Sequence, residues 1–157
     1  MKSRLILSRA GMQKFAAGAA KEIAAQKTGQ HATVIALVGE LGAGKTTFAQ
    51  GFLKQLGVKS HVSSPTFLII KPHTLRKLPY TRAFHIDCYR LNKPQELIAL
   101  GLKDILKNPA HIVLIEWPKL IKKYLPKNTR WITISHSKLK ETRGRRISSA
   151  FADLVGR

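Results

Sequence analysis

The pattern of apolar and polar residues along the 157-residue chain predicts short strands separated by helices. The segments 33–39 and 111–116 are continuous apolar runs containing β-branched residues, which is typical of strands buried on both faces of a sheet. Several other short segments share this strand character. We therefore expect strands at 5–7, 33–39, 66–73, 82–91, 111–116, 130–136 and 145–152.

Apolar residues recur at helical spacing in the segments between these strands. Ser8 is suited to cap the first helix, because its hydroxyl can accept a hydrogen bond from a free backbone N–H, and Gly29 is suited to end that helix. Pro94 suits the first position of a further short helix that ends at Gly101. We expect helices at 9–28, 45–56, 94–100 and 119–125. This layout predicts an α/β fold, with residues 1–157 forming one domain around a mixed central sheet of about seven strands flanked by helices.

The most specific motif of the chain lies between the second strand and the second helix. Gly39, Gly44, Lys45 and Thr46 match G-x-x-x-x-G-K-[ST] in the strand–loop–helix context that this motif requires. Glycines let successive backbone N–H groups point at phosphate oxygens, and the helix adds the positive end of its dipole. The motif predicts a P-loop NTPase-like domain in which Lys45 reaches the outer phosphates and Thr46 offers its hydroxyl to Mg²⁺. The residues expected to bind the nucleotide here are Gly39, Glu40, Leu41, Gly42, Ala43, Gly44, Lys45, Thr46 and Thr47.

Nucleotide chemistry also needs carboxylates near the loop, either to hold Mg²⁺ or to orient an attacking water. The chain has only eight acidic residues, and two of them, Asp87 and Glu116, follow apolar strand segments. Ligands of open α/β sheets bind at the carboxyl ends of the strands, so both side chains are expected to face the phosphates. We predict Asp87 and Glu116 as catalytic residues, and Glu116 with Thr46 as metal ligands. The pattern leaves open which carboxylate holds Mg²⁺ and which orients the water.

Three further features near these acids have two readings each. Ser64 and Thr66, in the segment that links the P-loop helix to the next strand, would sense the γ-phosphate and its metal, or would form an ordinary turn. Arg90 would contact phosphate or pair with Asp87. Trp117 would stack on a base or a partner, or would pack against the sheet.

The chain is strongly basic, with 28 Lys and Arg residues against 8 Asp and Glu and a formal net charge of +20. Such a surface attracts polyanions, so nucleic acid is the first partner to consider. The alternative is a lineage whose proteins drift basic without a specific ligand. From Pro118 onward there are eleven Lys and Arg residues against two acids, which suggests that this region approaches RNA or an acidic partner.

Cysteine content and hydropathy limit the cellular setting. The single Cys88 excludes an internal disulfide and fits a reducing cytosol, so we expect a cytoplasmic protein. No apolar run approaches the roughly 20 residues that a membrane-spanning helix needs, so we expect no membrane association.

Taken together, five segments resemble one known family. GELGAGKTTFAQGFLKQLGV, SSPTF, FHIDCYRL, PQELIALGLKDIL and VLIEWP occur in this order and with appropriate spacing. They resemble the bacterial TsaE (YjeE) family of small P-loop ATPases, which are required for making threonylcarbamoyladenosine in tRNA. The resemblance runs from about Leu5 to the final strand.

The resemblance implies an ATPase that acts with TsaD and TsaB, the pair that transfers threonylcarbamoyl to an adenosine beside the anticodon. TsaE proteins are not regarded as the transferase; their ATP binding and slow hydrolysis reset or support the complex. The implied cofactors are ATP and Mg²⁺, and the implied partners are TsaD, TsaB and tRNA, contacted directly or through the complex. By position, Ser64-Pro65-Thr66 would form a switch-like segment, with Thr66 counted among the catalytic residues, and Trp117 would lie beside the nucleotide.

Two departures and two alternative functions remain. Glu40 stands where the family usually has Asp, and the ending ETRGRRISS follows the family pattern only loosely, which leaves Arg143 and Arg145 without assigned roles. A small-molecule P-loop kinase would also use this loop, although no insertion is long enough for a separate acceptor domain and lid. A nucleotide-gated RNA-binding module with negligible catalysis would also fit the basic composition.

Overall fold

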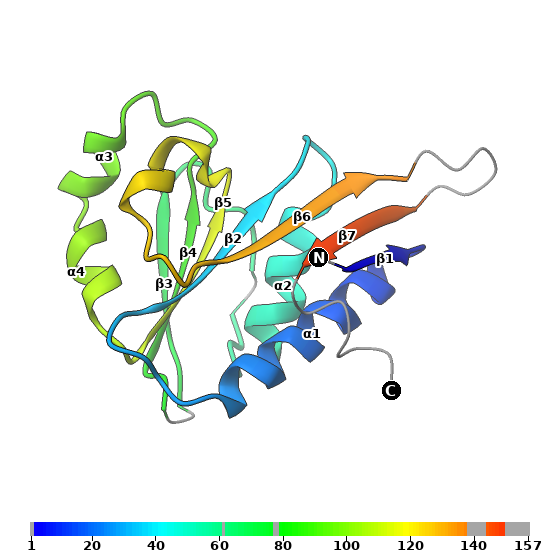
Figure 1. Ribbon diagram of the computed structural model, residues 1–157, viewed down its shortest axis with the longest axis horizontal. Helices are drawn as coiled ribbons and strands as arrows, with labels where there is room; N and C mark the ends of the chain where they lie inside the picture. Colours follow the sequence, from blue (N-terminus) through cyan, green and yellow to red (C-terminus); the bar gives the residue numbers. More distant parts are fainter. Residues whose placement is uncertain (1, 61, 77–78, 138–143, 150–157) are drawn as a thin grey trace.

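A computed structural model describes residues 2–60, 62–76, 79–137 and 144–149. Within these residues seven strands form one mixed sheet in the order β1-β7-β6-β2-β5-β4-β3 (Figure 1). The pairs β6–β2, β2–β5 and β5–β4 are parallel, and the pairs β1–β7, β7–β6 and β4–β3 are antiparallel. The strands are β1 (Lys2–Ile6), β2 (Thr33–Val38), β3 (Ile70–Thr74), β4 (Arg82–Asp87), β5 (His111–Glu116), β6 (Arg130–His136) and β7 (Arg145–Ser149). The predicted fold class, α/β with a mixed sheet of seven strands, is confirmed.

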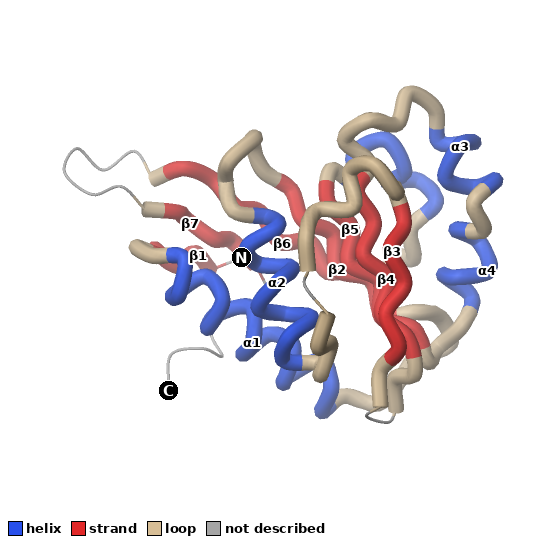
Figure 2. The backbone as a smooth tube through the Cα atoms, turned by 180° about the vertical axis from the view of Figure 1, so that it is seen from behind, coloured by secondary structure: helices blue, strands red, loops and turns tan. Residues whose placement is uncertain are grey.

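Helices cover both faces of this sheet. The two longer helices, α1 (Arg9–Ala25) and α2 (Lys45–Gln55), lie side by side and pack on one face (Figure 2). The short helices α3 (Pro94–Ala99) and α4 (Leu102–Lys107) and the 3₁₀ helix η1 (Pro118–Tyr124) pack on the other face. No helix in the described part of the chain has both the length and the apolar content needed to cross a membrane.

The strands β2 and β5 are apolar along most of their length because both of their faces are covered. In β2, Ile35 and Leu37 join the core under α1 and α2, whereas Val34 joins the core under α3, α4 and η1. In β5, Leu114 and Val113 divide between the two cores in the same way. Successive side chains of a strand point to opposite faces, so a continuous apolar run fills both cores at once.

Two of the predicted strands are shorter than expected, and the first is displaced. The strand predicted at 66–73 begins only at Ile70, because the carbonyl of Pro65 accepts hydrogen bonds from the N–H groups of Leu68 and Ile69 at 2.8 and 2.7 Å and closes a turn. Ile69 has a φ of 62°, which is incompatible with an extended strand. The strand predicted at 82–91 ends at Asp87, and the strand predicted at 5–7 is β1, which ends before Leu7.

The predicted helix ends also need correction. Ser8 caps α1 as predicted, its Oγ accepting from the N–H of Gly11 at 3.0 Å, but α1 ends at Ala25 rather than near Gly29. The chain after Pro94 forms two short helices, because Gly101 has a φ of 91° and breaks the helical path between them. The helix predicted after Pro118 is η1, a 3₁₀ rather than an α-helix. The predicted continuation of the last strand through 150–152 lies outside the described residues.

The helices α1 and α2 approach one another most closely at Gly51. A Cβ atom at this position would lie 2.6 Å from both the Cα and the carbonyl oxygen of Gln13 on α1. These neighbours are backbone atoms of a helix and cannot rotate away. Gly51 is therefore required by the contact between the two helices.

We predict that Gly51→Ala lowers the free energy of unfolding by about 1–3 kcal/mol, because the added methyl group overfills the contact with α1. In an unconstrained helix interior the same change raises stability by roughly 0.5–1 kcal/mol, so the sign of the effect is diagnostic. Urea unfolding measures it, with Gly29→Ala as the control, since a Cβ at Gly29 meets nothing within 4 Å. A Gly51→Ala protein as stable as the unmodified chain would contradict this packing.

Candidate functional site

The candidate site lies at the carboxyl ends of the parallel strands β2, β5 and β4. The loop 39–44 leaves the end of β2 and leads into α2, while Glu116 and Asp87 end β5 and β4. Together with the segment before β3 they enclose a cavity of about 410 Å³. Its lining residues are Leu41, Gly42, Gly44, Lys45, Thr46, Thr47, Ser64, Thr66, Asp87, Tyr89, Glu116 and Trp117.

Three glycines allow the loop to take this shape. Gly42 and Gly44 have φ values of 73° and 106°, a backbone region that side chains disfavour. At Gly39 the constraint is close approach, because a Cβ would lie 2.2 Å from the carbonyl oxygen of Ile134 on β6. Of the predicted loop residues, Gly39 lies against β6, Ala43 is buried in the core under α1 and α2, and Glu40 is exposed; none of the three lines the cavity.

Lys45 is held inside the loop. Its Nζ donates to the carbonyl oxygens of Gly39 and Glu40 at 3.0 and 2.8 Å and lies 3.8 Å from the centre of the Trp117 ring. The side chain is almost fully buried, and burial lowers the pKa of Lys45, while Glu116 and Asp87 act in the opposite direction. The ammonium therefore lacks most of its water and is satisfied by carbonyl oxygens and an aromatic face.

Glu116 connects the helix after the loop to the strand beneath it. Its carboxylate accepts from Thr46 Oγ1 at 3.1 and 3.2 Å and contacts His85 Nε2 at 2.9 Å. Both Glu116 and His85 are buried, and His85 Nδ1 has no hydrogen-bond partner in the described part of the chain. Because an ionised carboxylate can only accept, the hydrogen of this His85 tautomer lies on Nε2.

His85 was missed by the sequence analysis. The available signal was its spacing from Asp87: residues two apart in a strand share a face, so a histidine two residues before a candidate carboxylate points to the same side of the sheet. Its contact with Glu116 joins residues that are 31 positions apart, which the sequence alone does not reveal.

Asp87 accepts hydrogen bonds from the segment Ser64-Pro65-Thr66, the switch-like segment of the sequence analysis. Its Oδ2 accepts from Ser64 Oγ and from Thr66 Oγ1, both at 2.7 Å, and its Oδ1 accepts from the Tyr89 N–H at 2.9 Å. The two hydroxyl oxygens are themselves 2.7 Å apart. Asp87 also lies directly beside Glu116 in the register of β4 and β5. The structure thus brings together the Thr66, Asp87 and Glu116 side chains that the sequence placed in one site.

Aromatic residues line the side of the cavity next to Lys45. Trp117 has a φ of 57°, and its ring lies 5.0 Å from the ring of Tyr89. Trp117 thus lies beside Lys45 at the cavity, and its expected place beside a nucleotide stays a prediction. Arg90 lies over the ring of Phe67 at 4.3 Å, and the contacts recorded for the described residues include none between Arg90 and Asp87.

Two residues from distant strands reach the outside of the loop. Arg145, at the start of β7, donates from Nη2 to the carbonyl oxygen of Gly42 at 3.2 Å. His136, at the end of β6, has Nε2 3.4 Å from the carbonyl oxygen of Leu41. The sequence left Arg145 without a role, and Arg143 lies outside the described residues. The Arg145 side chain thus supports the loop by a hydrogen bond to the loop backbone.

The donor set at this site suits Mg²⁺ bound together with a phosphate ligand. Thr46 and Glu116 present a hydroxyl and a carboxylate oxygen within hydrogen-bonding distance of each other, and Asp87 adds a second carboxylate alongside. Within the described residues no cluster of three or more His, Cys, Asp or Glu side chains could hold a metal alone. Mg²⁺ normally takes one or two carboxylates and completes its shell with waters and substrate phosphates, so these residues fit it.

Comparison with known proteins identifies relatives over much of the chain. The chain is 40% identical over 104 residues to the tRNA threonylcarbamoyladenosine biosynthesis protein TsaE of Bacillus subtilis, covering 66% of this chain and 62% of that protein. It is 35% identical over 108 residues to the protein of the same name from Haemophilus influenzae, covering 68% of this chain and 65% of the relative. The matched part thus spans somewhat less than two thirds of the length of these curated relatives.

A solved structure and a family model extend the match. The crystal structure of Bacillus subtilis YdiB is similar with a TM-score of 0.71 and 28% identity, covering 94% of this chain and 83% of that one. The family model described as threonylcarbamoyl adenosine biosynthesis protein TsaE matches residues 8–147. This range includes the loop, both carboxylates and the five strands β2, β3, β4, β5 and β6. The chain therefore belongs to the TsaE family.

Proposed function

We propose that this protein binds ATP with Mg²⁺, hydrolyses it slowly, and in this way supports tRNA threonylcarbamoyladenosine synthesis together with TsaD and TsaB. The proposal is based on two sets of hydrogen-bonded side chains that lie next to each other beside the P-loop. Thr46 is bonded to Glu116, and directly beside it Ser64 and Thr66 are bonded to Asp87. Membership of the TsaE family supports the biosynthetic role.

Phosphate binding would begin with the loop backbone. The positive φ values of Gly42 and Gly44 turn the backbone so that N–H groups can face a bound anion, and the start of α2 adds its dipole. Lys45 would then exchange its present acceptors, the carbonyls of Gly39 and Glu40, for phosphate oxygens. This exchange is favourable because a charged acceptor makes a stronger hydrogen bond with an ammonium group than a neutral carbonyl does.

The metal would be held from the side of α2. Thr46 would offer its hydroxyl to Mg²⁺, and Glu116 would bind the metal directly or through a coordinated water. Bound Mg²⁺ supplies neutralisation of the charge that develops on the phosphate oxygens. His85, donating from Nε2, would keep the Glu116 carboxylate aimed at Thr46.

Hydrolysis would use the Asp87 side of the site. Asp87 would accept a hydrogen bond from the attacking water and orient its oxygen toward the γ-phosphorus, while Ser64 and Thr66 fix the position of the carboxylate. A bond forms between the water oxygen and the γ-phosphorus, the bond from that phosphorus to the β–γ bridging oxygen breaks, and the products are ADP and inorganic phosphate. Asp87 is already bonded to three donors, which favours slow turnover, since a water must compete for its oxygens.

A protein partner is supported by the rim of the cavity. Several large apolar side chains around it are exposed, and Phe67 is the most exposed of them at 84%. An exposed apolar group of this kind is typical of a protein–protein contact. The members of this apolar rim are Leu41, Phe67, Leu68 and Tyr89. TsaD or TsaB docked here would sense the nucleotide directly, because Phe67 and Leu68 follow Thr66.

Substitutions at the site are expected to affect ATP binding and ATP hydrolysis differently. We predict that Asp87→Asn and Glu116→Gln lower the rate of ATP hydrolysis by about 10²–10³-fold while changing the ATP dissociation constant only slightly, because they remove charge from the reacting side of the site. Lys45→Ala should instead abolish measurable ATP binding. Equilibrium nucleotide binding and phosphate release measure the two effects.

The result also distinguishes the alternatives. If both carboxylate variants kept normal function in cells, a nucleotide-gated RNA-binding module would be the better description. ATP consumption that required a small hydroxylated acceptor would indicate a kinase.

His85 provides a test of how Glu116 is positioned. We predict that His85→Leu raises the Mg²⁺ concentration for half-maximal hydrolysis by about tenfold, because losing a hydrogen bond to a metal-binding carboxylate commonly weakens metal affinity by 10–100-fold. His85→Gln should recover most of this loss, since its amide N–H₂ can donate to the carboxylate. ATP binding measured without Mg²⁺ should be the same in both variants. If the two substitutions shifted the Mg²⁺ requirement equally, His85 would serve only to fill the core.

The biosynthetic role is tested by reconstitution. TsaD and TsaB from the same organism, tRNA transcript, threonylcarbamoyl donor and ATP are combined with and without this protein, and modified tRNA is quantified over time. We expect repeated turnover only when this protein and ATP are both present, and none with Asp87→Asn in its place. Equal product formation without the protein would overturn the assigned role, even if the isolated chain hydrolyses ATP.

A further inference from the structure

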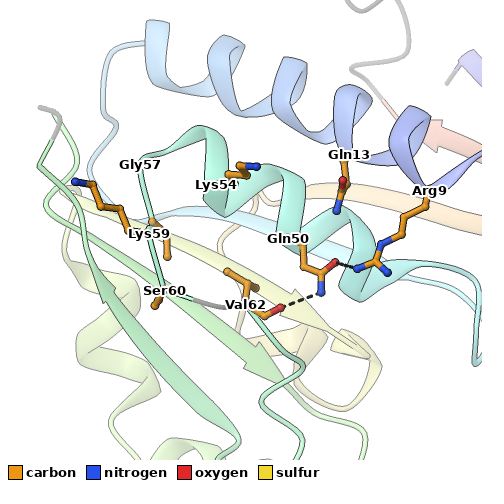
Figure 3. Close-up of a pocket in the computed structure, with 9 residues that line it drawn as sticks. Arg9, Gln13, Gln50, Lys54, Gly57, Lys59, Ser60 and Val62 are labelled. Carbon is orange, nitrogen blue, oxygen red and sulfur yellow. Dashed lines mark hydrogen bonds between the residues drawn. The ribbon is translucent and has the colours of Figure 1, made fainter.

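Two adjoining cavities lie at the opposite end of α2 from the nucleotide site. Their volumes are about 620 and 690 Å³, and both are lined by the segment 57–60, so they lie next to one another. Figure 3 shows residues that line the first, among them Lys54 from α2, Lys59 from the following segment and Arg9 from α1. Arg76 lines the second. We call these two adjoining cavities together the basic groove.

The groove is positively charged, and the described part of the chain places no carboxylate against its cations. Lys54, Lys59 and Arg76 are exposed, and the ion pairs recorded for the described residues include none of them. Arg9 donates from Nη2 to Gln50 Oε1 at 3.0 Å, which leaves its charge uncompensated because Gln50 is neutral. None of the acidic residues in the described part of the chain lines either cavity. Clefts lined by one sign of charge concentrate ligands of the opposite sign.

The chemistry of the lining favours a sugar–phosphate chain over a protein surface. Protein interfaces are built around a buried apolar and aromatic centre. The large apolar residues that are exposed among the described residues, such as Phe67 and Leu41, line neither cavity of the groove. The described residues that line the groove include no Phe, Tyr or Trp. Between its cations lie the polar side chains of Gln13 and Ser60, which can bond to phosphate or ribose hydroxyl groups, together with smaller apolar residues such as Val58 and Val62.

The end of α2 is compatible with an anion nearby. Helix carboxyl ends carry partial negative charge on their free carbonyl groups. Here the carbonyls of Phe52, Leu53 and Lys54 accept hydrogen bonds from the N–H groups of the next residues, 56–58, and Lys54 itself lies in the last turn. The helix end therefore does not cancel the field of the surrounding cations.

We propose that the basic groove binds the sugar–phosphate backbone of RNA, at a surface separate from the nucleotide site. The two sites share structural elements. Thr46, Gln50 and Lys54 follow one another at four-residue spacing along one side of α2, so the helix carries the metal-binding hydroxyl at one end and a groove lysine at the other. Gln50 also donates to the carbonyl oxygen of Val62 at 2.9 Å, two residues before Ser64 (Figure 3). RNA in the groove thus contacts the elements that hold the switch-like segment.

The proposal is tested by RNA binding without nucleotide, which makes it independent of the ATPase assignment. The probe is a fluorescein-labelled 20-nucleotide single-stranded RNA of mixed sequence, and its anisotropy is measured with the full chain over a series of salt concentrations. The groove variant is Lys54→Glu with Lys59→Glu. The matched control is Lys103→Glu with Lys107→Glu on α4, which changes the net charge equally, alters a lysine in the last turn of a helix as well, and lies on the opposite face of the sheet.

We expect the groove variant to lose at least about tenfold in affinity and to lower the slope of log K against log salt concentration by about 1–2, as the loss of two phosphate contacts requires. The control variant should change affinity by less than about threefold. Lys54→Gln with Lys59→Gln should show a smaller loss of the same kind, and it keeps the test valid if the glutamate variant folds poorly. Thermal unfolding and ATP binding of each variant serve as checks on folding.

Three results would overturn the proposal. The first is equal loss of RNA affinity in the groove and control variants, which would indicate attraction by net charge alone. The second is absence of RNA binding by the unmodified chain at about 50 mM salt, where phosphate contacts are strongest. The third is unchanged RNA affinity in the groove variant combined with weakened binding to the TsaD–TsaB pair, which would identify the groove as a protein-docking surface.

Discussion

The parallel pairing of β4 with β5 is the constraint on which the site depends, because its register sets Asp87 directly beside Glu116. Two adjacent buried carboxylates repel each other and are stable only when each has its own hydrogen-bond donors. Glu116 has Thr46 and His85, and Asp87 has Ser64, Thr66 and the Tyr89 backbone. A slip of β4 by one residue would turn Asp87 toward the opposite core and leave the Ser64 and Thr66 hydroxyl groups without their acceptor. The position of α2 and of the switch-like segment therefore follows from the register of two strands.

Sequence reasoning succeeded where a local pattern has one physical cause. The runs 33–38 and 111–116 form strands as predicted, because a strand that is covered on both faces is apolar along most of its length, and Asp87 and Glu116 lie at strand ends as expected. It failed where the cause is not visible in the pattern of residue types. The turn at 66–69 depends on where the Pro65 carbonyl points, and the contact of His85 depends on another strand.

In the loop 39–44, too, some features follow from the motif and others depend on a distant strand. The positive φ values of Gly42 and Gly44 are implied by the motif, whereas the need for glycine at Gly39 comes from the backbone of Ile134, on a strand that is 95 residues later. Glu40, which departs from the usual family residue, contributes through its carbonyl oxygen rather than through its exposed carboxylate. Its substitution for Asp therefore leaves the described contacts of Lys45 unaffected.

The contact at Gly51 has a mechanical consequence. Because the backbones of α1 and α2 touch there, α2 cannot roll or slide without moving α1 with it. The backbone N–H groups at the start of α2 therefore keep a fixed direction. Binding of an anion to them would cost little conformational entropy in the loop. If the protein hydrolyses ATP as proposed, a change of shape would be expected in the segment 62–69, which belongs to no strand or helix and is held by hydrogen bonds to Asp87. Under that proposal α2 would be the rigid part of the phosphate site, and the segment 62–69 would be the part that adjusts.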